Sequence, residues 1–248
     1  RCGTPQTTED GVSVVERYIA TAERLWGPYR WDAYDMVVLP KSFAYGGMEN
    51  PRLTFLNRAL VVGDGSLTDT IAHEIAHSWF GNAVTNASWS QFYLNEGFTM
   101  YAQRRICEEV HGAAFTALEA KVGWKLLEDA VRDATDPALT ALHVPLAMDV
   151  DPDDTYTDVP YEKGYALLEF LRSHVGTARL DAWLRKYVDA FAFRCIESTD
   201  MLDHLRAEFG DEVASFDASE WLLGRGLPPF TPDFGAAEAL TAPADRLL

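Results

Sequence analysis

The sequence is short of cysteine, of positive charge and of long apolar runs. Its 248 residues contain three cysteines, Cys2, Cys107 and Cys195, which are odd in number, lie far apart and form neither a disulfide framework nor a CxxC metal pattern. This usage is typical of a reducing compartment, so we expect a cytoplasmic protein, with a secreted one as the open alternative. No apolar run approaches the roughly 20 residues that span a bilayer, so we expect no membrane span.

Positive charge is scarce, with 21 Lys and Arg against 38 Asp and Glu and a net charge of −17. This balance disfavours binding to a phosphate backbone, so we expect no nucleic-acid partner, and it would mildly attract cationic ligands. The alternative is that the acidity serves solubility alone. The apolar content of 48% is typical of a globular protein, and a chain of this length can bury a sizeable core.

Helical periodicity dominates the chain, and the few expected strands lie near its N-terminus. A first helix is expected over 12–26, stopped by Gly27-Pro28, and short buried strands are expected at 36–40 and 59–64. The further expected helices are 66–80, 95–110, 113–133, 161–175, 178–192, 199–209 and 215–224. The pattern predicts an α+β domain.

The stretch HEIAH at 73–77 carries the clearest chemical pattern. His73 and His77 are four residues apart, so both imidazoles leave the same side of a helix one turn apart. This spacing suits two corners of a tetrahedral zinc site, and Glu74 lies beside the pair without having to be a ligand itself. Taken alone, the pattern also fits a surface helix with two exposed histidines.

A third ligand has to come from elsewhere in the chain, because Phe80 and Ala83 occupy the places of the glycine and third histidine in the extended HExxH pattern. The stretch LNEGFTMY at 94–101 supplies Glu96, nineteen residues after His77. Two histidines and one carboxylate leave a fourth position open for water, as a catalytic zinc requires.

Together these stretches resemble the zinc aminopeptidases of the gluzincin class, whose signature is HExxH, eighteen residues and then Glu. Within that family they look most similar to the branch that contains aminopeptidase B and leukotriene A4 hydrolase. The motifs that carry the resemblance stand in family order: GGMENP at 46–51, HEIAHSWFGN at 73–82, LNEGFTMYAQRR at 94–105, VPYEKGYALL at 159–168 and GLPP at 226–229.

The resemblance covers nearly the whole chain and implies a fold and a metal. The implied fold is a thermolysin-like zinc peptidase catalytic domain, a mostly helical lobe with a small N-terminal sheet. The implied cofactor is one Zn²⁺ per chain, with His73, His77 and Glu96 as ligands. Glu74 is implied as the general base, and the implied activity is that of a zinc metallo-aminopeptidase, a hydrolase.

The GGMEN motif is implied to bind the substrate through Gly46, Gly47, Met48 and Glu49. The two glycines have no side chains, so a substrate backbone can approach them closely. In the family the residue at Glu49 binds the free α-ammonium of a peptide, so the expected partners are peptides with a free N-terminus. The alternative is a glycine turn followed by a solvated carboxylate.

Three residues near the fourth motif complete the implied site. The family tyrosine at Tyr161 donates its hydroxyl to the oxyanion, a task that suits a phenol with a pKa near 10. Tyr156 matches a second active-site tyrosine, and Asp153 matches an acidic residue that we expect to favour Arg or Lys as the first residue of the substrate. The alternatives are core aromatic residues and a solvated acidic turn.

The chain departs from the family at Gln103, where many members carry Glu. A ligand histidine needs a partner for its second ring nitrogen, and the Gln103 carbonyl could accept that hydrogen bond. Family members also have a β-domain before this region and a helical domain after it. We therefore expect 1–229 to be the catalytic domain and 230–248 to begin a linker to a C-terminal helical domain that is not present.

Two other functions are compatible with the same motifs. One branch member hydrolyses a lipid epoxide at this site, and Tyr156 and Asp153 leave that activity open, although it requires a long apolar pocket. The other is a metal-free homologue that binds partners without catalysis. That alternative predicts damage to the ligand or base positions, all of which are intact.

Overall fold

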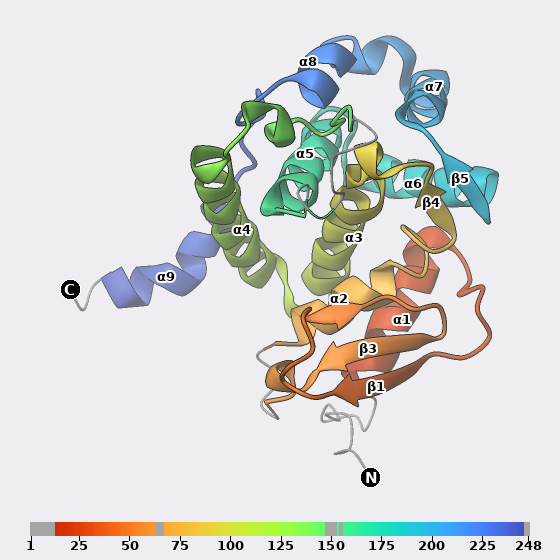
Figure 1. The fold of residues 1–248 in the computed structure, drawn as a ribbon, viewed down its shortest axis with the longest axis vertical. Coiled ribbons are helices and arrows are strands. Elements are labelled where there is room, and N and C mark those ends of the chain that lie inside the picture. The colour runs from red at the N-terminus through yellow and green to blue at the C-terminus, as the bar shows by residue number, and fades with distance from the viewer. Residues whose placement is uncertain (1–12, 63–66, 147–152, 154–155, 246–248) are drawn as a thin grey trace.

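The computed structural model describes residues 13–62, 67–146, 153 and 156–245 and is mostly helical with few strands, which confirms the predicted class (Figure 1). Its helices are α1 (Val14–Trp26), α2 (Thr68–Ala76), α3 (Tyr93–His111), α4 (Ala113–Asp133), α5 (Gly164–Val175), α6 (Thr177–Phe191), α7 (Ser198–Phe209), α8 (Ala218–Leu223) and α9 (Glu238–Asp245). Its strands are β1 (Asp35–Leu39), β2 (Gly47–Met48), β3 (Leu53–Asn57), β4 (Val84–Asn86) and β5 (Arg194–Ile196).

The N-terminal sheet has the order β1-β3-β2, with β1 parallel and β2 antiparallel to β3, and it packs against α2. The strand predicted at 59–64 is wrong. The third strand ends at Asn57, whose side-chain Oδ1 accepts a hydrogen bond from Ala59 N at 2.9 Å and starts a 3₁₀ turn. Val61 and Val62 are exposed rather than buried, and 63–64 lie outside the described residues.

A second, two-stranded sheet pairs β4 in parallel with β5, which are more than 100 residues apart in the sequence. Both strands have three residues, too few for an alternating pattern to be recognised, so the sequence analysis missed them. Strands are therefore not confined to the N-terminal part of the chain.

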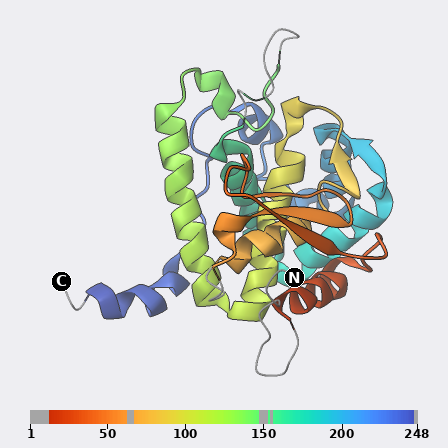
Figure 2. The ribbon, with the colours of Figure 1, turned by 60° about the horizontal axis from the view of Figure 1, so that its bottom comes forward.

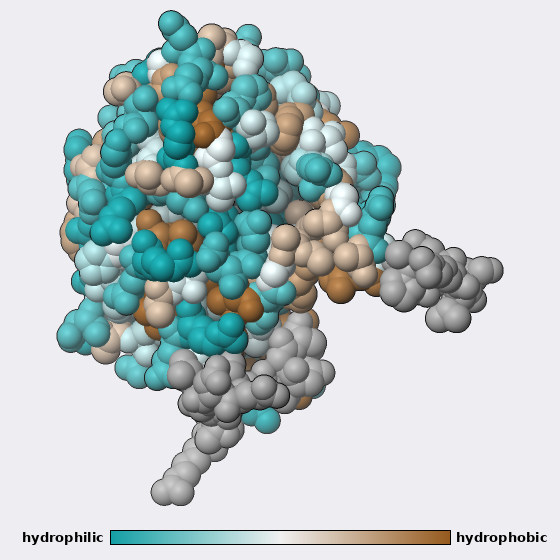
Figure 3. Space-filling model, turned by 180° about the vertical axis from the view of Figure 1, so that it is seen from behind, coloured by the Kyte–Doolittle hydropathy of each residue, from teal (hydrophilic) through white to brown (hydrophobic). Residues whose placement is uncertain are grey.

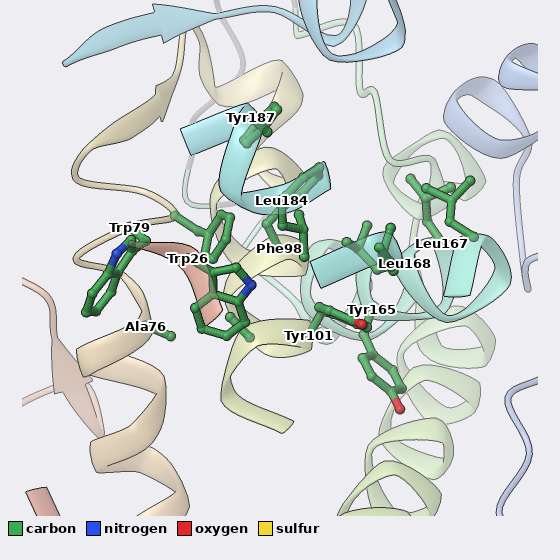
Figure 4. Packing of buried hydrophobic residues seen from close by; sticks show 14 of the residues in the cluster. Trp26, Ala76, Trp79, Phe98, Tyr101, Tyr165, Leu167, Leu168, Leu184 and Tyr187 are labelled. Carbon is green, nitrogen blue, oxygen red and sulfur yellow. The ribbon is translucent and has the colours of Figure 1, made fainter. Parts of the chain in front are cut away.

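α3 is the central helix of the molecule and contacts α1, α2, α4 and α5. Buried side chains occur all around it, as expected for a helix enclosed on every side. Figure 4 shows aromatic rings from three helices in the core: Phe98 of α3 stacks on Tyr187 of α6 with ring centroids 5.2 Å apart, close to Trp26 of α1. Side chains of α1, α3 and α6 thus belong to one apolar core.

The helix predicted over 161–175 has a different first turn. Residues Val159–Lys163 form a π-helical turn, η5, and the α-helix α5 starts at Gly164. Such turns are rare and are often found at functional sites. The predicted helix 66–80 is also shorter, since α2 runs from Thr68 to Ala76.

The C-terminal part of the described chain passes along α4. Phe234 lies against Trp124 of α4, with ring centroids 6.2 Å apart, and α9 follows and extends away from the body (Figure 2). The face seen in Figure 3 is largely hydrophilic, with apolar residues in small groups. Within the described ranges, no helix combines the length and the apolarity that crossing a membrane requires.

α3 and α5 touch backbone to backbone at Gly97 and Gly164. A Cβ atom at Gly97 would lie 2.6 Å from the Gly164 Cα and 3.0 Å from the Pro160 carbonyl oxygen. Neither partner is a flexible side chain that could move aside. The contact therefore sets how closely the η5 turn approaches the start of α3.

We expect Gly97→Ala to lower the free energy of unfolding by about 1–3 kcal/mol, because the added methyl group has to push two backbones apart. Urea unfolding followed by circular dichroism measures this loss. An unchanged denaturation midpoint would show that the crossing has room for a side chain.

Candidate metal centre and active site

Three side chains from two helices converge at one point. His73 lies in α2, His77 follows its last turn, and Glu96 lies in the first turn of α3. The His73 Nε2 and His77 Nε2 atoms are 3.1 Å apart, and the Glu96 Oε2 atom is 3.3 Å and 3.4 Å from them. A tetrahedral ion with ligand bonds of 2.0–2.1 Å separates its ligand atoms by about 3.3 Å, so the triangle has the size that zinc requires.

The environment of this triangle requires a positive charge. Glu96 is buried and its Oε2 atom has no hydrogen-bond partner among the described residues. Burial raises the Glu96 pKa, but the opposite effect of His77 and His73 is larger and brings the pKa to about 2, so the carboxylate is charged. Burial lowers the His77 pKa, yet Glu96 raises it to about 10, so the surroundings of this ring favour a positive charge. The donor set therefore fits a divalent metal.

The second nitrogen of each histidine is fixed by a hydrogen bond. His73 Nδ1 donates to Gln103 Oε1 at 3.0 Å, which confirms the partner expected from the sequence. His77 Nδ1 donates to the Phe80 carbonyl oxygen at 3.0 Å. Both bonds orient the Nε2 lone pairs towards Glu96.

The surroundings of His77 include two residues that the sequence analysis missed. The Thr99 hydroxyl donates to the Phe80 carbonyl at 2.6 Å and lies 3.1 Å from His77 Nδ1. Gly81 has φ +119°, and a Cβ atom there would lie 2.6 Å from His77 Nδ1. Thr99 is one turn after Glu96 on the same side of α3, a spacing that could have revealed it.

Glu74 lies beside the triangle and is itself buried, with Oε2 unpartnered within the described part of the chain. A Cβ atom at Gly47 would overlap its carboxylate, so the β2 backbone passes directly over it. Burial raises the Glu74 pKa to about 7, although His73 and His77 act in the opposite direction. A carboxyl group with this pKa can accept and release a proton near neutral pH.

Every site residue predicted from the sequence lines one cavity of about 210 Å³. These residues are Gly46, Gly47, Met48, Glu49, His73, Glu74, His77, Glu96, Asp153, Tyr156 and Tyr161. Glu49 follows β2, and the Asn82 side-chain amide donates to its backbone carbonyl at 2.7 Å. The Glu49 carboxylate lies close to two residues of the candidate metal centre. A carboxylate oxygen of Glu49, one of Glu74 and a ring nitrogen of His77 lie within 4.8 Å of one another.

Aromatic side chains form one wall of the cavity. Phe92 lies between Trp89 and Tyr156, with ring centroids at 4.9 Å and 6.4 Å, and Tyr45 contacts Tyr156 at 5.7 Å. The sequence analysis missed Tyr45, Trp89 and Phe92. They come from a loop and a 3₁₀ turn, where no periodicity marks the side that a residue faces.

Tyr161 stands over the triangle from the η5 turn. Its ring is nearly parallel to that of His73, at an interplanar angle of 24° and a centroid distance of 6.1 Å. Burial, with smaller effects of Glu96 and Tyr156, raises its pKa well above the usual 10, so the phenol keeps its proton.

A second cavity, of about 520 Å³, shares His73 and Tyr161 with the first and is bordered by apolar side chains of α4.

Comparison with known proteins places this geometry in a family. The model of the peptidase family M1 domain matches residues 12–221. Aminopeptidase B of Mus musculus is 46% identical over 248 residues, which cover 96% of this chain and 38% of that protein. Leukotriene A-4 hydrolase of Xenopus laevis is 43% identical over 225 residues, covering 88% of this chain and 37% of that protein. The chain thus spans well under half the length of these relatives.

Solved structures share this fold. The structure of native leukotriene A4 hydrolase from Saccharomyces cerevisiae superposes with a TM-score of 0.88 at 39% identity, over 94% of this chain and 38% of that one. An M1 zinc metallopeptidase from Deinococcus radiodurans, at 24% identity and a TM-score of 0.71, shares the fold. The chain belongs to peptidase family M1, a family of zinc metallopeptidases that includes aminopeptidase B and leukotriene A4 hydrolase.

Proposed function

We propose that this chain carries the catalytic site of a zinc aminopeptidase that removes the first residue of peptides. The observation that supports this most directly is that the His73–His77–Glu96 triangle, Glu74 and Glu49 share one cavity. Membership of family M1 and the likeness to aminopeptidase B support the same activity.

In this proposal His73, His77 and Glu96 hold one Zn²⁺ per chain. When bound there, zinc polarises a carbonyl oxygen and lowers the pKa of a water ligand from 15.7 to about 7. The fit rests on the size of the triangle and on the unpartnered buried Glu96 oxygen. The fold we propose is thermolysin-like, with 1–229 as the catalytic domain and 230–248 as the start of a linker to a helical domain.

The chain's own residues perform the remaining tasks. The Glu49 carboxylate pairs with the α-ammonium group of the peptide, and the substrate main chain lies against Gly46 and Gly47, which line the same cavity. Glu74 accepts a proton from the attacking water and transfers it to the leaving amine, so that one water is consumed for each peptide bond broken. The Tyr161 hydroxyl donates a hydrogen bond to the oxyanion of the tetrahedral intermediate.

The cavity explains why only one residue would be removed. Its volume of about 210 Å³ is below that of a drug-sized ligand pocket and suits a single amino-acid side chain. Glu49 places a carboxylate in the cavity close to Glu74 and His77, where it can pair with a charged N-terminus. The larger cavity beyond His73 and Tyr161 leaves room for the rest of the peptide.

A basic first residue fits this cavity best. Asp153 lines it together with the aromatic rings of Trp89 and Tyr156. The aliphatic stem of Arg or Lys can lie against these rings, its charge can interact with their faces, and a carboxylate can pair with the cation. Met48 borders the same space.

Epoxide hydrolysis of the leukotriene A4 hydrolase type remains the second candidate on the strength of the relatives. It has less support than the aminopeptidase activity, because the relatives at 46% identity are aminopeptidase B, whereas leukotriene A-4 hydrolase of Xenopus laevis is 43% identical. An inactive partner-binding homologue has no support, because the cavity contains every residue that the peptidase chemistry requires.

Further parts of the proposal concern partners and compartment. The partners are peptides with a free N-terminus and the domains that flank this region in longer relatives, since the chain spans 38% of mouse aminopeptidase B. We propose a cytoplasmic protein, in line with the two described cysteines, Cys107 and Cys195, which are unpaired; Cys2 lies outside the described residues.

Replacement of Glu74 tests the catalytic proposal. Glu74→Gln should lower kcat by about 10²–10⁴-fold, because the amide cannot accept the proton, and should leave the zinc content unchanged. Activity assays combined with elemental analysis measure both. Removal of zinc by a chelator from the unaltered protein should also abolish hydrolysis. Full activity after chelation, or loss of zinc in the variant, would contradict the assigned roles.

Replacement of Gln103 tests the support of His73. Gln103→Leu should weaken zinc binding by about 10–100-fold, because His73 Nδ1 loses its acceptor. Competition with a chromophoric chelator measures the affinity. Gln103→Glu is the matched control, since it keeps an acceptor at the same place and should bind zinc at least as tightly. Equal affinities for all three forms would remove Gln103 from the metal site.

A panel of fluorogenic aminoacyl substrates tests the first-residue preference. We expect Arg and Lys to be cleaved faster than Leu and Ala, and Asp153→Asn to reduce kcat/KM for the basic substrates roughly tenfold, because a charge-assisted contact is lost. The Leu substrate serves as the control and should change little. Equal rates on Leu, Ala and Arg in the unaltered protein would refute the preference.

A further inference from the structure

Two buried charges follow Tyr161 in the η5 turn, and neither takes part in the proposed chemistry. Glu162 and Lys163 are 5% and 1% exposed. Each is held by a different part of the molecule. The turn that carries the phenol is therefore attached on two sides.

Glu162 ties the turn to α3. Its two carboxylate oxygens accept one hydrogen bond each from Arg104 Nη1 and Nη2, both at 2.8 Å. This paired geometry is the strongest form of an Arg–carboxylate contact. Gly123 of α4 makes room for it, since a Cβ atom there would overlap both side chains. The ion pair satisfies the charge of Glu162 completely.

Lys163 ties the turn to two other segments, and it does so without a counter-ion. Its Nζ atom donates to the carbonyl oxygens of Thr140, Gly224 and Gly226, each at 2.8 Å. No carboxylate forms an ion pair with it within the described ranges. Three carbonyls match the three donors of an ammonium group, and their positions are coupled, because Gly226 N donates to the Thr140 hydroxyl at 2.7 Å.

Lys163 and Tyr161 use opposite sides of the turn. Residues two apart in a helical turn do not face each other. Accordingly, Tyr161 faces His73 and the cavity, while Lys163 points to the carbonyls behind the turn. Burying an ammonium group among neutral carbonyls is costly, and burial lowers the Lys163 pKa to about 8. An apolar residue at this place would leave the three carbonyl oxygens without a donor, so the ammonium group is what attaches the turn to both segments.

We propose that Lys163 is a positioning residue for the Tyr161 hydroxyl. Its hydrogen bonds to three backbone carbonyl oxygens fix the position of the π-helical turn relative to the proposed metal ligands. The inference rests on the proposed function, in which that hydroxyl meets the oxyanion. A π turn is less favourable than an α-helical one, so the backbone relaxes when its anchor is removed. A displacement of about 1 Å at a catalytic group is enough to lower a rate by about 100-fold.

A double-mutant cycle tests the proposal on the enzyme with zinc bound. Kinetics are measured for the unaltered protein, Lys163→Met, Tyr161→Phe and the double variant, with zinc content and thermal unfolding as controls. We expect Lys163→Met to lower kcat by about 10–100-fold with KM nearly unchanged. In the Tyr161→Phe background the same change should have less than about a threefold effect, because the hydroxyl that Lys163 positions is already gone.

Two further variants separate positioning from general damage. Lys163→Arg keeps the charge and the donors and should recover part of the lost kcat; where Lys163→Met does not fold, Lys163→Arg carries the same cycle with Tyr161→Phe. Lys125→Met, the same change at a lysine on α4 whose side chain is 61% exposed, should have no effect.

Two results would overturn the positioning role, and two others would overturn the proposed function. Equal losses of kcat from Lys163→Met with and without the Tyr161 hydroxyl, or an unchanged kcat, would overturn the positioning role. Full activity of Tyr161→Phe alone, or an unaltered protein with no zinc-dependent hydrolysis, would instead overturn the proposed function, and the two failures are distinguishable.

Discussion

The backbone contact between Gly97 and Gly164 is the constraint on which the geometry of the site depends. It brings the first turn of α3, which carries Glu96, against the segment that carries Tyr161, at a separation that no side chain could tolerate. Glu96 and Tyr161, the proposed metal ligand and the proposed oxyanion donor, are 65 residues apart in the sequence and thereby reach the same cavity. Packing of this kind does not deform gradually, so small residues at the crossing fix the distance.

The buried charged groups near this contact differ in whether their polar atoms have hydrogen-bond partners. The buried carboxylates of Glu74 and Glu96 line the cavity and each has an oxygen without a partner among the described residues, where the proposed chemistry requires a proton acceptor and a cation ligand. Glu162 and Lys163 do not line this cavity, and the carboxylate of the first and the ammonium group of the second are hydrogen-bonded to Arg104 and to three backbone carbonyls. Around the η5 turn, these two cavity-lining carboxylates thus keep an unpartnered oxygen, whereas Glu162 and Lys163 are used to attach the turn to its neighbours.

The sequence could predict much of the fold and nearly all of the lining of the site, but by two different routes. Spacing alone predicted that His73 and His77 share a helix face, because four residues make about one helical turn. The GGMEN and PYEKG motifs entered through resemblance to a family, since a glycine turn or a tyrosine at a helix start has no chemistry of its own. The wrong strand at 59–64 was an apolar run like that of β1, but Asn57 ends the strand with a side-chain hydrogen bond that composition does not reveal.

What the sequence determined by itself was local: the α-helices, the ligand types and their spacing along the chain. Such features are set by backbone hydrogen bonds between residues four apart, which any one segment contains. Only the tertiary structure decided the ligand triangle of 3.1–3.4 Å, the aromatic wall of Tyr45, Trp89 and Phe92, and the three carbonyls around Lys163. These depend on how distant segments pack, and no single segment encodes that packing.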